Sequence, residues 1–169
     1  MTDSDLINAC LRNDRSAQRI LYDRYKRAMY TLAYRLTSDF DDANDILQDT
    51  FLDVFRKLET FKGESTIGAW IRVILVRKAY KRLNKPKLWE LSNEIPQSSE
   101  VTWNNSIDGE YLEKAIFSLP QGFRMVFTLI EIEGYSHKEV ANILGISEGT
   151  SKSQLFYSKK RLREILIKQ

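Results

Sequence analysis

The segment Ser136–Leu162, "SHKEVANILGISEGTSKSQLFYSKKRL", contains two short helical patterns that meet at a single glycine, Gly145. Ser136 and Glu139 have the spacing of a capping box, in which each side chain bonds to a free backbone N–H of the other residue. Gly145 provides the left-handed turn that ends the first helix, and Ser147 is placed to cap the second. This order of signals predicts a helix-turn-helix.

The second helix of this pair has two possible roles. In a DNA-binding helix-turn-helix its first residues enter the major groove. In a plain hairpin inside a helical bundle, the bases near its end would only stabilise the helix C-terminus. The helical period places Ser151, Leu155, Ser158 and Leu162 inward. The residues predicted to lie outward or near the DNA backbone are Glu148, Gly149, Thr150, Lys152, Ser153, Gln154 and Tyr157, followed by the basic Lys159 and Lys160. Glutamine pairs bidentately with adenine, so Gln154 is a candidate for reading that base.

The rest of the chain has the composition of an all-α protein. Its 169 residues include only seven glycines and three prolines, and no alternating β pattern is present. Between residues 85 and 106 the helical period fails, and Pro, Ser and Asn become frequent, which is typical of a linker. We therefore expect two small helical domains, residues 1–84 and 107–169, joined by a flexible linker over 85–106.

The charges are strongly sorted along the chain. The stretch Ser38–Phe55 has six aspartates and no base, whereas Arg72–Lys87 has seven bases and no acid. Some of the aspartates answer a helix dipole, and the glycine and glutamate of a calcium loop are missing, so a metal site is not indicated. We expect the acidic helix to dock a basic protein surface and to be set apart from the cationic helices.

The segment Phe61–Lys87 combines aromatic and basic side chains, as single-strand-binding surfaces do. In such surfaces the cations follow the phosphates, while aromatic side chains or a pocket receive unstacked bases. Core packing is the alternative role for Trp70. The bases Arg77, Lys78, Lys81 and Arg82 have no acid among them and favour phosphate contact.

Several classes of protein are disfavoured by the sequence. The first residues lack a signal peptide, and no apolar run reaches the length of a membrane span. Cys10 is the only cysteine and His137 the only histidine, so neither a disulfide, a thiolate zinc site nor a catalytic cluster is indicated. We expect a cytoplasmic protein that is not an enzyme, binds no metal or cofactor and does not insert into a membrane.

Five segments together resemble a known family. In chain order they are "LYDRY", "DDANDILQDTF", "TIGAWIRVILVRKA", "LPQGFRMVFTLIEIEGYSHKEVANILGISEGT" and "SKSQLFYSKKRL". From about Ile20 to Leu166 the chain resembles the bacterial sigma-70 family, specifically the small extracytoplasmic-function (ECF) sigma factors. The resemblance implies a subunit that binds core RNA polymerase, recognises promoter DNA and opens it. A helix-turn-helix regulator that binds operators without joining the polymerase is the alternative.

The resemblance also implies a role for each part. One group of residues would bind the polymerase β′ clamp: Asp42, Asp45, Gln48, Asp49 and Phe51. A second group would melt the −10 element and hold the opened strand: Lys62, Ser65, Thr66, Trp70, Arg72, Arg77, Lys78, Lys81 and Arg82. The linker would thread the RNA exit path, and the second domain would read the −35 element and meet the β flap. Such sigma factors usually rely on a separate anti-sigma factor, often membrane-bound.

The chain departs from the family pattern at a few positions. The usual family residue is glutamate at Asn44, asparagine at Arg77, valine at Ser151 and arginine at both Gln154 and Tyr157. The base preferences of better-known relatives should therefore not be transferred to this chain.

Overall fold

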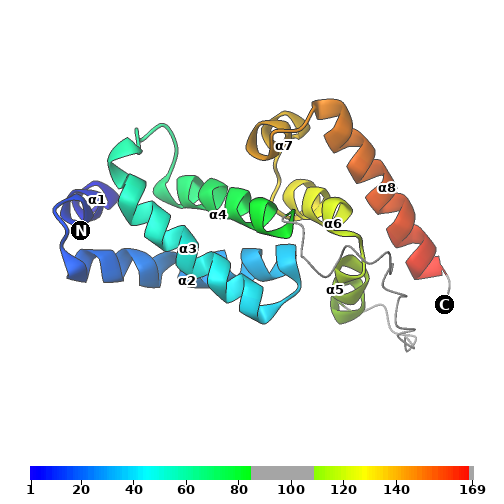
Figure 1. Ribbon diagram of the computed structural model, residues 1–169, viewed down its shortest axis with the longest axis horizontal. Helices are drawn as coiled ribbons and strands as arrows, with labels where there is room; N and C mark the ends of the chain where they lie inside the picture. Colours follow the sequence, from blue (N-terminus) through cyan, green and yellow to red (C-terminus); the bar gives the residue numbers. More distant parts are fainter. Residues whose placement is uncertain (85–108, 168–169) are drawn as a thin grey trace. The chain divides into compact units, whose positions relative to one another are not determined.

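The computed structural model describes residues 1–84 and 109–167, and within these ranges all regular structure is helical (Figure 1). The chain divides into two compact units, Met1–Arg82 and Leu83–Gln169. The predicted all-α class is confirmed. The predicted linker, residues 85–106, lies outside the described residues.

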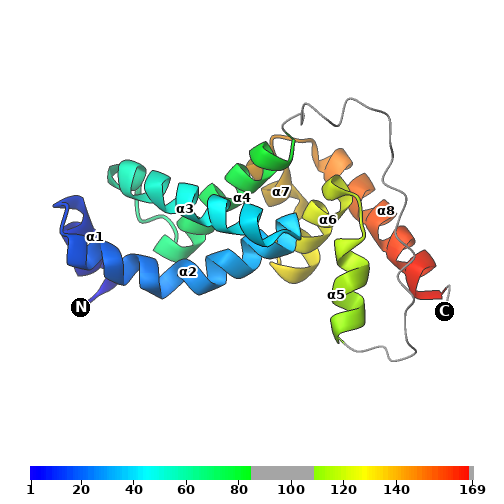
Figure 2. The same ribbon diagram turned by 60° about the horizontal axis from the view of Figure 1, so that its bottom comes forward.

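The first unit is built on an antiparallel pair of helices. Its elements are α1 (Asp3–Leu11), α2 (Arg15–Thr37), α3 (Phe40–Lys57), a 3-10 turn (Leu58–Thr60) and α4 (Ile67–Leu83). Figures 1 and 2 both show α3 running back along α2. Ser38 makes the reversal between them in the left-handed region, at φ 53°. A Cβ on Gly68 would lie 2.8 Å from the Tyr25 ring, so the glycine lets α4 pass close to α2.

The sequence predicts helix caps at Asp3 or Ser4, at Ser16 and at Ser65, and the structure uses a nearby residue in each case. Thr2 rather than Asp3 or Ser4 caps α1, and it forms the reciprocal capping box with Asp5. Asp14 rather than Ser16 caps α2. Before α4 the amide of Ala69 donates to the hydroxyl of Thr66, so Thr66 takes the role expected of Ser65. Neighbouring Ser, Thr and Asp residues are all competent caps, and backbone geometry decides between them.

Ion pairs join the acidic helix α3 to the basic helix α4. Asp53 of α3, whose side chain is only 14% exposed, accepts from Lys78 of α4 at 3.0 Å, and Arg56 and Lys57 of its own helix also pair with it. Near the other end of α3, Arg82 of α4 pairs with two further aspartates. The expectation that the acidic helix is set apart from the cationic α4 is therefore wrong.

The second unit contains the helix-turn-helix. Its elements are α5 (Gly109–Phe117), α6 (Gln121–Phe127), a π-helical turn (Thr128–Ile132), α7 (His137–Leu144) and α8 (Glu148–Ile167). Gly145 ends α7 in the left-handed conformation, as predicted. At the start of α7 the amide of Glu139 donates to Ser136, which is one half of the predicted capping box. The sequence predicts one helix from Gly122 to Glu133, whereas in the structure the short helix α6 is followed directly by the wider π turn.

Two buried hydroxyls attach α8 to the helices that support it. The predicted inward positions Ser151, Leu155, Ser158 and Leu162 are all buried. Ser151 lies 2.8 Å from Nδ1 of His137 on α7, and Ser158 donates to the carbonyl of Phe123 on α6 at 2.9 Å. Hydrogen bonds at these two points fix the orientation of α8 more narrowly than apolar contact alone, because they depend on direction.

The link between Asp53 and Lys78 predicts how the stability of the first unit changes with pH. The hydrogen bond from Lys78 holds the pKa of Asp53 below its usual value, and Lys57 adds to this. A lowered folded-state pKa gives stability that is present above the unfolded value, about 3.9, and is lost as pH falls through the folded value. We expect Asp53→Asn to lower the free energy of unfolding by about 1 kcal/mol at pH 7 and to cost much less at pH 3.

Urea unfolding of the full chain at both pH values measures this difference. The matched control is Asp3→Asn, because Asp3 makes an exposed pair with Arg24 and its loss should have a small effect at either pH. An equal cost of Asp53→Asn at pH 7 and pH 3 would show that the ion pair is not its cause.

Candidate nucleic-acid and protein interfaces

Helix α3 presents an acidic face to solvent. Its buried residues recur at three- and four-residue steps and pack inward, which turns the residues between them outward. Asp41, Asp45, Gln48 and Asp49 are all exposed on that outer side. The amide of Asp42 donates to Asp39, which caps the helix. The structure therefore brings four of the five predicted polymerase-binding residues, Asp42, Asp45, Gln48 and Asp49, to one side of one helix.

Phe51 is the exception among these residues. Its side chain is 3% exposed and packs edge-on against the ring of Tyr22, with 4.9 Å between ring centroids. A partner that docks on the acidic face cannot reach it. Phe51 therefore belongs to the core that holds α3 against α2, and its expected place on the docking face is corrected.

Leu52 lies on the acidic face and was missed by the sequence reasoning. It is 61% exposed, four residues after Gln48 and seven after Asp45, which is the spacing of one helical stripe. The helical period alone could have identified it. An exposed leucine among carboxylates adds an apolar contact point to a surface that otherwise attracts bases.

Arg82 of α4 reaches across to the acidic face. Its Nη2 lies 2.8 Å from Oδ1 of Asp42 and 3.0 Å from Oδ2 of Asp45, and its Nε lies 3.0 Å from the same oxygen of Asp42. Partial burial lowers the pKa of the Arg82 guanidinium, but the two carboxylates outweigh that effect and leave it above its usual value. One predicted DNA-binding cation therefore pairs with two predicted polymerase-binding acids and offsets about half of their charge.

The loop before α4 and the start of that helix carry the next predicted group. Lys62, Ser65 and Thr66 are exposed, and Gly63 turns the loop at φ 72°. Trp70 is half-buried, and its ring lies against that of Phe61 with 5.4 Å between centroids. Trp70 thus has a packing role and still presents part of its surface beside the exposed loop.

The bases of α4 differ in how far their side chains are exposed to solvent. Lys78 and Arg82 are paired with aspartates of α3, as described above. Arg77 and Lys81 are exposed, and Arg72 is half-buried. Arg77 and Lys81 are therefore the bases of α4 that project furthest into solvent.

The first turns of α8 form an exposed surface. Ser147 caps the helix by accepting from the amide of Thr150 at 2.9 Å, and its own hydroxyl donates to that of Thr150 at 2.8 Å. The other exposed residues predicted here are Glu148, Gly149, Lys152 and Ser153. This is the part of a helix-turn-helix that enters a major groove. Phe156, which was not predicted, continues the exposed surface at 62% exposure.

Gln154 does not lie outward as predicted. Its side-chain oxygen is buried without a hydrogen-bond partner among the described residues, and a Cβ on Gly122 of α6 would lie 3.4 Å from it. The helical period places residue 154 near the boundary between the two sides of α8, and contact with α6 draws its amide inward. The orientation needed to read adenine is therefore absent from this structure.

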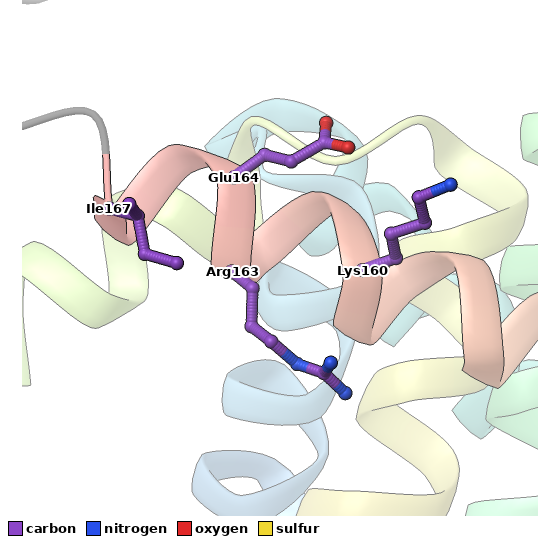
Figure 3. Close-up of a pocket in the computed structure, with 4 residues that line it drawn as sticks. All are labelled: Lys160, Arg163, Glu164 and Ile167. Atoms are coloured by element: carbon purple, nitrogen blue, oxygen red, sulfur yellow. The ribbon is translucent and has the colours of Figure 1, made fainter.

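The later residues of α8 are basic and partly engaged. Tyr157 is half-exposed and stacks on Phe123 of α6, and Lys159 pairs with Glu131 at 2.8 Å. Beyond them, Lys160, Arg163, Glu164 and Ile167 line an open hollow of about 370 Å³. Figure 3 shows the side chains of Lys160 and Glu164 directed away from that of Arg163, so these charges do not converge on one point.

The described residues, 1–84 and 109–167, contain no group of three or more His, Cys, Asp or Glu side chains that could hold a metal ion. Within the same ranges no helix is long and apolar enough to cross a membrane.

Two parts of this chain match models of two regions of one protein family. The Sigma-70 region 2 model matches residues 21–87, and the Sigma-70 region 4 model matches residues 109–162. The ECF RNA polymerase sigma factor SigE of Mycolicibacterium smegmatis is 33% identical over 150 residues, which are 83% of this chain and 58% of that protein. SigM of Mycobacterium tuberculosis, also an ECF sigma factor, is 27% identical over 98% of this chain and 85% of its own length.

A solved structure agrees with these matches. The sigma factor RpoE from Bartonella quintana, determined in complex with the anti-sigma factor NepR, is 28% identical with a TM-score of 0.62, over 83% of this chain and 90% of that one. Both described units thus match successive regions of the same kind of protein. The chain belongs to the sigma-70 family of bacterial RNA polymerase sigma factors, in its ECF group.

Proposed function

We propose that this chain is a promoter-specificity subunit in which three separate surfaces act together. The outer side of α3 binds core RNA polymerase, the loop before α4 with α4 itself holds the opened −10 strand, and the start of α8 reads the −35 element. The observation that carries this proposal is the exposed, capped start of α8 in one unit, together with the acidic face of α3 in the other.

The acidic face suits a basic protein partner better than DNA. Asp41, Asp45 and Asp49 would repel phosphate, whereas they would attract lysines and arginines on the polymerase clamp. Exposed Leu52 supplies the apolar contact that such interfaces need at their centre. The second unit would also meet the β flap, as the family resemblance implies.

The exposed cations and the partly exposed tryptophan favour a role for α4 at the single strand. Arg77 and Lys81 project into solvent, and Trp70 lies beside the loop that precedes the helix. Cations along a helix follow phosphates, while an aromatic surface receives an unstacked base. Opening the duplex costs free energy, so we expect it only when polymerase and both DNA elements are engaged.

The proposal also includes a regulator and a location. RpoE of Bartonella quintana was solved with an anti-sigma factor, and we propose that a separate anti-sigma factor sequesters this chain as well. We propose that this chain acts in the cytoplasm, where polymerase and promoter DNA meet. The chain supplies recognition and strand opening, and the polymerase supplies the chemistry.

Run-off transcription with purified core polymerase on a promoter library tests the whole proposal. We expect the full chain to restore initiation at a defined set of promoters. A regulator that only binds operators would leave core polymerase without specific initiation, and that result would contradict the proposal.

The exposed carboxylates of α3 predict a defect in polymerase binding. Asp49→Asn removes a charge from the outer face and should weaken binding of the full chain to core polymerase roughly three- to tenfold at low salt. The matched control is Asp3→Asn, a change of equal charge on α1. Titration of labelled variants with core polymerase, followed by fluorescence anisotropy, measures both.

The start of α8 predicts a change in salt dependence. If Lys152 contacts a phosphate, then Lys152→Ala should lower the log–log salt slope of holoenzyme binding to duplex −35 DNA by about 0.9. Lys114→Ala on α5, where Lys114 pairs with Glu110, removes the same charge elsewhere in the unit. Equal slopes for the wild type and the Lys152 variant would remove this residue from the DNA surface.

The inward amide of Gln154 predicts that its loss is tolerated. A buried polar atom without a partner costs stability, so Gln154→Met should leave the free energy of unfolding unchanged or raise it by up to about 1 kcal/mol. We also expect the same preferred −35 bases when binding to a randomised −35 library is sequenced. A changed base preference at one position would instead show that the side chain turns outward on DNA.

A further inference from the structure

We propose that Arg82 is an internal competitor of the polymerase: in the free chain it occupies Asp42 and Asp45, and docking of the polymerase on α3 must displace it. This inference rests on the proposed function of α3. It adds a regulatory contact between two surfaces that the sequence places 37 to 40 residues apart.

The geometry of Arg82 is that of a bridge between two acids. Three of its N–H···O contacts, at 2.8 to 3.0 Å, go to these carboxylates, and two of the three go to Asp42. The contacts use Oδ1 of Asp42 and Oδ2 of Asp45. A basic side chain of a partner that approached the same carboxylates would meet a positive charge already in place.

The bridge divides the acidic face into two parts. Asp41 and Asp49 are exposed and make no ion pair with any described residue, so their full charge is presented to a partner. Asp42 and Asp45 share one arginine and together present about one net negative charge. The attraction that the whole face exerts on a basic surface is therefore weaker than its aspartates alone would produce.

The bridge is also built to open. The Arg82 side chain is 38% exposed and that of Asp45 is 58% exposed, and ion pairs with this access to water are weak. Arg82 lies on the last turn of α4, one residue before the helix ends at Leu83. The long side chain can leave the carboxylates without any rearrangement of the core.

Displacement would connect the two proposed surfaces of the first unit. A guanidinium released from α3 lies next to exposed Lys81, on the helix that we propose follows the opened strand. Binding of the polymerase would then add one cation to the DNA surface at the moment it is needed. Such a link between two binding events is reciprocal, so strand binding would in turn favour polymerase docking.

This competition is tested by the affinity of the full chain for core polymerase, measured without DNA. The direction in which the affinity changes when Arg82 is replaced decides the outcome. Arg82→Gln should bind roughly three- to tenfold more tightly than the wild type at low salt, and the gain should shrink at high salt. A purely structural role for Arg82 would produce the opposite sign, because losing the bridge would loosen α4. Arg82→Lys keeps the charge but lacks the forked guanidinium that bridges both carboxylates, so its affinity should lie between those of the wild type and Arg82→Gln.

The matched control is Arg12→Gln, which removes the same charge from the end of α1, a helix that lies at the opposite end of this unit from the start of α3 (Figure 2). If Arg12→Gln binds core polymerase as much more tightly as Arg82→Gln does, the gain is a general charge effect and the proposal is overturned. Unchanged or weaker binding of Arg82→Gln overturns it as well.

The variant Asp49→Asn distinguishes a failure of the proposed competition from a failure of the proposed docking face. If it weakens binding while Arg82→Gln fails to strengthen it, only the competition is wrong. If Asp49→Asn has no effect, the docking face itself is wrong and the competition falls with it.

Discussion

The amphipathic packing of α3 is the constraint on which the first unit depends. Its buried stripe, which includes Ile46, Phe51 and Val54, holds the helix against α2 and leaves no freedom in which side chains face outward. The same packing brings Asp53 within reach of Lys78 and Asp42 within reach of Arg82. The acidic surface and the ion pairs that partly neutralise it therefore have a single cause.

In the second unit, buried hydroxyl groups help to attach one helix to another, in addition to the apolar side chains. Ser151 stands where the family usually has valine, and it meets the only histidine of the chain across the helix-turn-helix. Ser158 is bonded to the backbone of α6. Burying a hydroxyl that is hydrogen-bonded in this way costs little free energy. Because hydrogen bonds depend on direction, these two also restrict the orientation of α8.

Periodicity and glycine placement were sufficient to predict much of this structure. The four inward positions of α8 and the left-handed turn at Gly145 follow from local rules, and local rules are what a sequence displays. The cap before α4 was missed because Ser65 and Thr66 are chemically equivalent candidates. The bridge from Arg82 to α3 was missed for a different reason. It joins residues that are distant in sequence, and helical periodicity contains no information about which helices become neighbours.

Sorted charges along a chain do not by themselves define separate surfaces in space. When an acidic and a basic helix belong to one small unit, they are brought close enough to pair, and each pair withdraws two charges from what a partner meets. The charged residues that make no ion pair then determine what a partner meets more than the total number of charges does. Here these are Asp41 and Asp49 on α3 and Lys81 on α4, among the described residues. Recognition by this unit is therefore better understood from its unpaired charges than from the charge totals of its sequence.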